Sequence, residues 1–103
     1  ADPKGWLGYL QLGNIEFHKP PIFGGSKEEA LKYYLKAEQF LLKDGIVRDW
    51  NLLSLWAQIG LTYEALDNLQ KAVAYYRKAL NAEPQFKWVR DELYTNLKKK
   101  KLR

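Results

Sequence analysis

Residues 56–84, WAQIGLTYEALDNLQKAVAYYRKALNAEP, decide the fold of this chain. Apolar and small residues recur three and four positions apart on both sides of Asp67-Asn68, which is the period of a helix with one buried face. Asp67 and Asn68 predict a turn that caps the second helix. Pro84 ends that helix, because proline cannot continue a helix interior. The stretch therefore predicts two helices joined by a tight turn.

Small residues within this stretch are spaced so that the two helices can approach closely. We expect Gly60, Ala72 and Ala79 at the closest contact, where a larger side chain would push the helices apart. The pattern resembles the signature of the tetratricopeptide repeat (TPR), a 34-residue helical hairpin, with Ile59 and Tyr76 in place of its Leu and Phe. Eight positions carry the resemblance: Trp56, Ile59, Gly60, Tyr63, Ala72, Tyr76, Ala79 and Pro84.

Another copy of the pattern lies N-terminal to residues 56–84 and forms the first repeat of the chain. Residues 28–37, EEALKYYLKA, match residues 70–79, QKAVAYYRKA, at five positions. Upstream, Tyr9, Leu12 and Gly13 align with Trp56, Ile59 and Gly60, whereas Glu16 stands where Tyr63 is expected. This first repeat is degenerate, and it needs extra residues in its turn.

Two insertions distort the first repeat. Prolines and glycines at positions 19–25 forbid helix and predict a shaped loop, after which Ser26 and Glu29 form a capping box. Ile22 and Phe23 in this loop either pack under the hairpin, which is the preferred interpretation, or form an exposed apolar contact. The second insertion covers residues 41–51. There we expect Gly45 to end one helix, Asp49 or Asn51 to begin the next, and Ile46 and Trp50 to pack down.

The chain after Pro84 predicts a capping helix rather than another repeat, since Tyr94 stands at the position of Gly60 and only one apolar stripe remains. That stripe consists of Phe86, Val89, Leu93 and Leu97. The expected fold class is all-α, an α-α superhelix of antiparallel helix hairpins with about two TPR repeats and a C-terminal capping helix. Helices are expected at 4–18, 26–43, 51–65, 68–82 and 85–99. A single TPR domain, 1–103, would comprise 4–44, 51–86 and 87–101.

Composition excludes several classes of function. The 103 residues contain no cysteine, which removes disulfides and thiolate metal sites. No apolar run is long enough to span a bilayer, so no membrane insertion is expected. The formal charge of +5 resides in Lys98–Arg103, and the rest of the chain is balanced. Because the basic run lacks interleaved aromatics, we expect a solvated tail rather than binding to nucleic acid or acidic lipid.

Catalytic residues are scarce. Glu16 and His18 are the acid and base candidates, but one histidine beside one glutamate makes neither a metal motif nor a convincing catalytic pair. The stretch Gly24-Gly25-Ser26-Lys27 lacks the full phosphate-binding pattern and a preceding strand. We therefore expect a protein that is not an enzyme and uses no cofactor or metal.

The TPR resemblance implies a protein- or peptide-binding scaffold. In this family the first helix of each pair lines a concave groove in which partner peptides, often extended, lie. Carried over by position, the groove residues are Leu7, Leu10, Asn14, Phe17, Ser54, Ala57, Gln58, Leu61, Glu64, Trp88, Asp91, Glu92 and Thr95.

One subgroup of the family clamps a C-terminal carboxylate with Lys, Asn and Arg. Here Asn14 keeps the clamp's asparagine position and Gln58 replaces a second asparagine. Leu10 and Trp88 occupy the lysine positions, and Glu92 stands where a basic residue is needed. The clamp is therefore absent, and a neutral or basic ligand with apolar anchors is expected.

The alternative is a structural module that self-associates through repeat stacking within a larger bacterial protein. Two repeats fall below the usual minimum of three for a stable stack. The Pro-Pro-Ile-Phe-Gly-Gly turn resembles turns of TPR proteins from Bacteroidetes-type bacteria, which are often exported. The chain begins at Ala1 and has no methionine, so we expect a processed protein or a fragment, and localisation stays open between exported and cytoplasmic.

Overall fold

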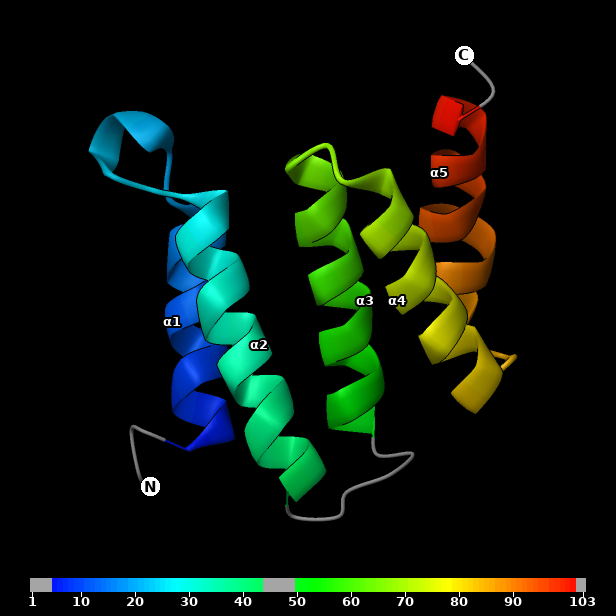
Figure 1. Ribbon diagram of the computed structural model, residues 1–103, viewed down its shortest axis with the longest axis horizontal. Helices are drawn as coiled ribbons and strands as arrows, with labels where there is room; N and C mark the ends of the chain where they lie inside the picture. The colour runs from blue at the N-terminus through cyan, green and yellow to red at the C-terminus, as the bar shows by residue number, and fades with distance from the viewer. Residues whose placement is uncertain (1–4, 44–49, 102–103) are drawn as a thin grey trace. The chain divides into compact units, whose positions relative to one another are not determined.

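The computed structural model describes residues 5–43 and 50–101. Its helices are α1 (Trp6–His18), α2 (Lys27–Lys43), α3 (Trp50–Ala65), α4 (Leu69–Ala82) and α5 (Tyr94–Lys101), as Figure 1 shows. A 3-10 turn, η1 (Pro21–Phe23), lies between α1 and α2, and a π-helical segment, η2 (Trp88–Leu93), leads into α5. The described residues contain no strand, which confirms the all-α prediction. The chain divides into two compact units, residues 1–47 and 48–103.

The first unit is an antiparallel hairpin of α1 and α2 (Figure 1). Gly13 faces the ring of Tyr34 so closely that a Cβ atom on the glycine would lie 2.6 Å from the tyrosine Cε1. Ala30 and Ala37 of α2 are fully buried. Small residues thus let the two helices approach, and the tyrosine fills the space beside them.

The second unit repeats this arrangement in α3 and α4. A Cβ atom on Gly60 would lie 2.4 Å from Cε1 of Tyr76, and Ala72 and Ala79 are fully buried. The chain from Gly13 to Tyr34 is five residues longer than the chain from Gly60 to Tyr76. Because the same glycine–tyrosine contact forms in both hairpins, the extra residues are confined to the first turn, as the alignment predicted.

The hairpins differ in the rings that surround this contact. In the second unit Tyr63 and Tyr75 pack with ring centroids 5.7 Å apart. In the first unit Glu16 occupies the position of Tyr63. Tyr33, which corresponds to Tyr75, therefore stacks on Tyr9 instead, with ring centroids 6.3 Å apart. The aromatic pair is therefore retained by a different partner, which explains how the degenerate first repeat still packs.

The predicted helix caps are found in part. Asn68 accepts a hydrogen bond from the Lys71 backbone N–H at 3.3 Å, and Ser26 accepts one from the Glu29 N–H at 3.1 Å. The Glu29 side chain does not complete the predicted capping box. Its Oε1 pairs instead with Nζ of Lys32, at 3.2 Å.

The start of α3 corrects one expectation. The helix already includes Trp50 and Asn51, so Asn51 is not its N-cap. The predicted roles of Gly45, Ile46 and Asp49 lie outside the described residues. Trp50 packs edge-on against Phe86, with ring centroids 5.3 Å apart, but 59% of its surface stays exposed, so the predicted packing of Trp50 is found only in part.

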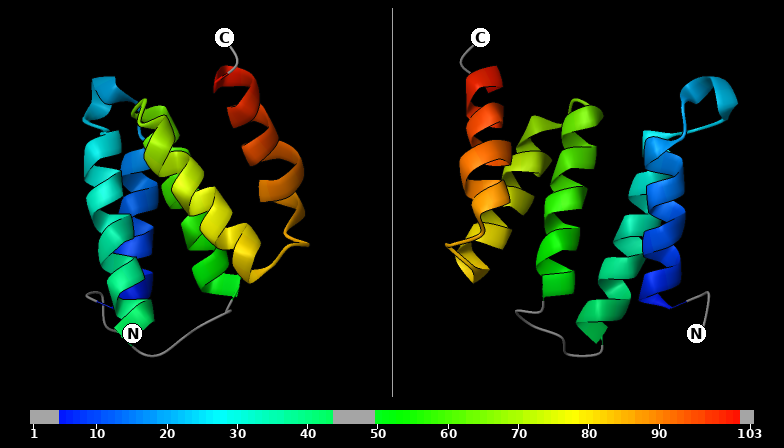
Figure 2. Two further views of the ribbon diagram at one scale, coloured as in Figure 1. Left: turned by 45° about the vertical axis from the view of Figure 1, so that its right-hand side comes forward. Right: turned by 180° about the vertical axis from the view of Figure 1, so that it is seen from behind.

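The turn between α1 and α2 corrects another expectation. Ile22 and Phe23 do not pack under the hairpin: their side chains are 85% and 71% exposed. The turn projects beyond the ends of both helices (Figure 2). Its backbone is nevertheless closed, with the Phe23 and Gly25 N–H groups both donating to the Pro20 carbonyl, at 2.9 and 3.1 Å. The exposure therefore belongs to an ordered turn.

The last helix follows the predicted apolar stripe but not the predicted regular geometry. Phe86, Val89, Leu93 and Leu97 are all buried. Their spacing of three, four and four residues nearly matches whole turns of a 3.6-residue helix, so the stripe stays on one side. The wide turn at Trp88–Leu93 is a local departure from regular α-helical geometry within this stripe.

Candidate functional site

One face of α3 stays accessible although half of the residues of the helix are buried. Ser54 and Ala65 are exposed, and Gln58 and Leu61 are half-buried. These four residues, spaced four, three and four apart, lie on one side of the helix, and we call them the α3 stripe. The buried positions of the same helix are Leu52, Leu53, Leu55, Trp56, Ala57, Ile59, Gly60 and Thr62. Ala57 is thus a predicted groove residue that offers no surface, since its methyl group is fully covered.

Gln58 provides a hydrogen-bond donor in the middle of the α3 stripe. Its Nε2 atom is buried, and no acceptor for it exists among the described residues. Its backbone carbonyl accepts the Thr62 hydroxyl at 2.7 Å. A buried amide without an acceptor costs about 1–3 kcal/mol, so an acceptor supplied by a ligand would recover part of that energy.

Glu64, at the edge of the α3 stripe, is tied to the core. Its Oε1 accepts the hydroxyl of Tyr76 at 3.0 Å. Burial, together with the nearby Glu64 carboxylate, raises the pKa of the Tyr76 hydroxyl far above its usual value. The tyrosine therefore stays protonated and donates, and the carboxylate is held in one orientation by a rigid partner.

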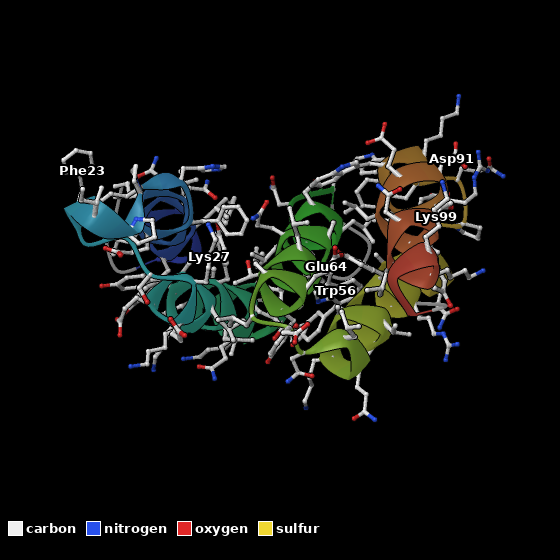
Figure 3. The ribbon with its side chains drawn as sticks, turned by 90° about the horizontal axis from the view of Figure 1, so that it is seen from above. Phe23, Lys27, Trp56, Glu64, Asp91 and Lys99 are labelled. Carbon is white, nitrogen blue, oxygen red and sulfur yellow. The ribbon has the colours of Figure 1, made fainter. Side chains whose placement is uncertain are left out.

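The start of the last helix, in the same unit, carries the other predicted groove residues. Asp91 and Glu92 are exposed and Trp88 is half-buried. Arg90 donates to both oxygens of Asp91, at 2.8 and 3.3 Å, and this bond lowers the pKa of Asp91. Figure 3 shows Asp91 on the outer side of the helix. Because Arg90 neutralises Asp91, Glu92 is the stronger negative group for a ligand to meet.

The first unit holds four predicted groove residues on α1. Leu7 is 43% exposed, and Leu10 and Phe17 are half-buried. The exposed Asn14 accepts the Tyr34 hydroxyl at 2.6 Å through its Oδ1. This hydrogen bond fixes the amide, so Asn14 is part of the hairpin packing as well as a candidate ligand contact.

The described residues hold a cavity elsewhere. It measures about 190 Å³ and is lined by Gln39, Phe40 and Lys43 near the end of α2, and none of the predicted groove residues lines it. The cavity is open, and its lining carries one amine, that of Lys43, without a paired acid and base.

The residues considered for catalysis are engaged in packing. Glu16 pairs with Lys19 at 3.8 Å, and His18 packs edge-on against Phe17 with centroids 5.0 Å apart. Lys27, the last residue of the glycine-rich stretch, donates to the Phe17 carbonyl and lies 3.9 Å from the centre of the Phe17 ring. The lysine caps the end of α1, a structural role that accounts for its position.

Among residues 5–43 and 50–101, no group of three or more His, Cys, Asp or Glu side chains could hold a metal ion. No helix in the same part of the chain has the length and apolar character to cross a membrane.

Comparison with known proteins supports the repeat directly. The family model of the tetratricopeptide repeat matches residues 53–86, the segment that contains α3, its short turn and α4. The chain contains a tetratricopeptide repeat. Neither the curated proteins nor the solved structures gave a match. Tetratricopeptide repeats are in general non-catalytic scaffolds for protein interactions, and the matched repeat suggests this general role.

Sequence reasoning missed two features of the candidate site. The pairing of Arg90 with Asp91 changes the charge that the last helix presents. The only sign of this pairing in the sequence is that the two opposite charges are adjacent. The unpartnered amide of Gln58 had no sequence signal, because it depends on which groups surround the side chain.

Proposed function

We propose that this TPR protein binds an extended peptide along the α3 stripe and the neighbouring start of the last helix, and that it catalyses no reaction. The observation that carries the proposal is the α3 stripe itself: four accessible positions on a helix that is otherwise largely buried. Small and polar side chains here leave room for a peptide backbone to approach, and Leu61 supplies an apolar contact.

The chemistry of the site selects the ligand. The Gln58 amide can donate to a backbone carbonyl after rotation about its last bond, which is the kind of contact that recognises an extended chain irrespective of its sequence. Trp88 is half-buried and offers an aromatic face to an apolar side chain. Glu92 is exposed and favours a neutral or basic peptide.

A displayed library of random peptides, selected against the whole chain, tests the proposal. We expect the selected peptides to bind the wild type and to lose at least about tenfold in affinity for Leu61→Arg and Ser54→Arg, because a long charged side chain blocks the α3 stripe. Ala74→Arg places the same side chain on the exposed face of α4 and should bind as the wild type does.

The controls separate loss of the site from loss of the fold. Circular dichroism and urea unfolding of each variant report whether the helices are intact. Selected peptides that bind folded Leu61→Arg and Ser54→Arg as tightly as the wild type would rule out the α3 stripe as the site. The four predicted residues of α1 are a separate candidate contact within the first unit, which Leu7→Arg tests in the same assay.

A structural module that self-associates is the alternative function. The feature that favours it is the pair of large apolar side chains, Ile22 and Phe23, exposed on the first turn. Stacking through the last helix is less suited to this role, because Arg90, Asp91, Glu92, Thr95 and Asn96 give that helix an exposed polar side, as expected of a capping element.

A further inference from the structure

Ile22 and Phe23, which we call the tip, are the most exposed large apolar side chains in the described part of the chain. Figure 3 shows Phe23 at the outer edge of the first turn, pointing away from α1 and α2. The Phe23 side chain is large, aromatic and 71% exposed. Removing its apolar surface from water would be favourable, so a contact that covers it gains free energy. Adjacent exposed apolar residues of this kind mark contact surfaces.

The turn that carries the tip is built to hold it outward. Pro20 and Pro21 fix two backbone φ angles, and Gly24 adopts a φ of 90° that L side chains rarely reach. Gly25 packs so closely that a Cβ atom would lie 1.8 Å from the Lys19 carbonyl oxygen. Since the turn is already ordered, little conformational entropy remains to be lost when the tip is covered.

Charges around the turn indicate which kind of surface covers it. Residues 16–32 contain three lysines and three glutamates, so the base of the turn is electrically balanced. Lys19 pairs with Glu16 and Lys32 pairs with Glu29, while Lys27 caps α1. An anionic bilayer would require available cations beside the apolar residues, whereas a balanced surface with both signs can face a copy of itself without repulsion.

From the exposed tip, its ordered turn and the balanced charge at its base, we infer that the turn is a self-association surface, at which the tips of two copies of this chain pack against each other about a two-fold axis. Such an isologous contact is the commonest form of homo-oligomer. Because two lysines and two glutamates at the base of each copy are already paired within that copy, two copies meet there without net repulsion. The inference rests on the alternative function proposed above, self-association, and gives it a surface and a symmetry. It does not depend on the peptide site, because Ile22 and Phe23 belong to the first unit and the α3 stripe belongs to the second.

Sedimentation equilibrium of the whole chain over a wide range of concentration measures the association. We expect a monomer–dimer equilibrium in the wild type. Ile22→Ser combined with Phe23→Ser should weaken it by at least about tenfold, because both apolar anchors are removed. Leu42→Ser is the matched control: Leu42 is 47% exposed on α2, lies away from the turn and should leave the dimer unchanged.

Cysteine cross-linking gives a second readout, because a disulfide can trap a weak dimer covalently. The chain contains no cysteine, so Ile22→Cys introduces a single thiol while retaining Phe23. Under mild oxidation we expect Ile22→Cys to form a disulfide-linked dimer much faster than Leu42→Cys, because only the first thiol meets its counterpart in the dimer.

Three outcomes would overturn the inference. The wild type could be monomeric at every concentration, or its dimer could be insensitive to the double serine variant. Alternatively, the monomer could bind phosphatidylcholine or phosphatidylserine vesicles in a manner lost in the double variant, which would assign the tip to a membrane. Leu61→Arg should leave the dimer intact, so failure of the peptide-binding proposal and failure of this inference are distinguishable.

Discussion

At the scale of single residues, Gly13 and Gly60 set the separation of the helices in each hairpin. Each faces a fully buried tyrosine ring, and a buried ring has no space into which it can move. Gly60→Ala should therefore lower the free energy of unfolding by about 1–3 kcal/mol through overpacking. Urea unfolding measures the change, and Ser54→Ala, an exposed substitution on the same helix, should stay within about 0.5 kcal/mol of the wild type. Equal stability of Gly60→Ala and Ser54→Ala would contradict the contact.

The buried hydroxyl of Tyr76 makes stability depend on alkaline pH. Its pKa is raised in the folded state by burial and by Glu64, whereas the unfolded chain releases this proton near pH 10. The stability that the protonated Tyr76 hydroxyl contributes is thus fully present below about pH 10 and is lost as the pH rises above it. We expect the free energy of unfolding to fall there by up to about 1.4 kcal/mol per pH unit from this group. Tyr76→Phe should show a shallower decline, and an identical slope in the two proteins would contradict the assignment.

At the scale of elements, the first turn is the part whose backbone is most constrained by its sequence. A Cβ atom on Gly25 would collide with the backbone carbonyl of Lys19, whereas one on Gly24 would meet open space and only the strain of a positive φ. We expect Gly25→Ala to destabilise the chain by about 2–4 kcal/mol and Gly24→Ala by about 1 kcal/mol. Urea unfolding of the two variants tests this order, and the reverse order would show that the turn is not closed as described.

The elements themselves were largely predictable. Four of the five expected helices begin and end within two residues of the observed bounds, because periodicity, Asn68 and Pro84 act locally on the backbone. The last helix was predicted with its buried stripe but without its π-helical turn. That turn depends on how Val89 and Leu93 fit against the rest of the unit, which a local pattern does not contain.

At the scale of the whole molecule, charge near the proposed peptide site should govern ligand preference. The net charge of +5 would repel basic peptides, whereas Glu92 attracts them locally. Glu92→Lys should weaken binding of a selected lysine-bearing peptide by about threefold at low salt, and by less at high salt where the charges are screened. Fluorescence anisotropy titrations at two salt concentrations measure this. Unchanged affinity at low salt would place the peptide away from Glu92.

The sequence by itself determined the two helix hairpins and the register within each. Helical period and the pairing of a glycine with a tyrosine are encoded in residues that meet through short connections. Only the tertiary structure decided that Ile22 and Phe23 are exposed, that Lys27 caps α1, and that Arg90 neutralises Asp91. Exposure and pairing depend on which side chains arrive beside one another once the chain has folded, and composition and spacing do not specify those neighbours.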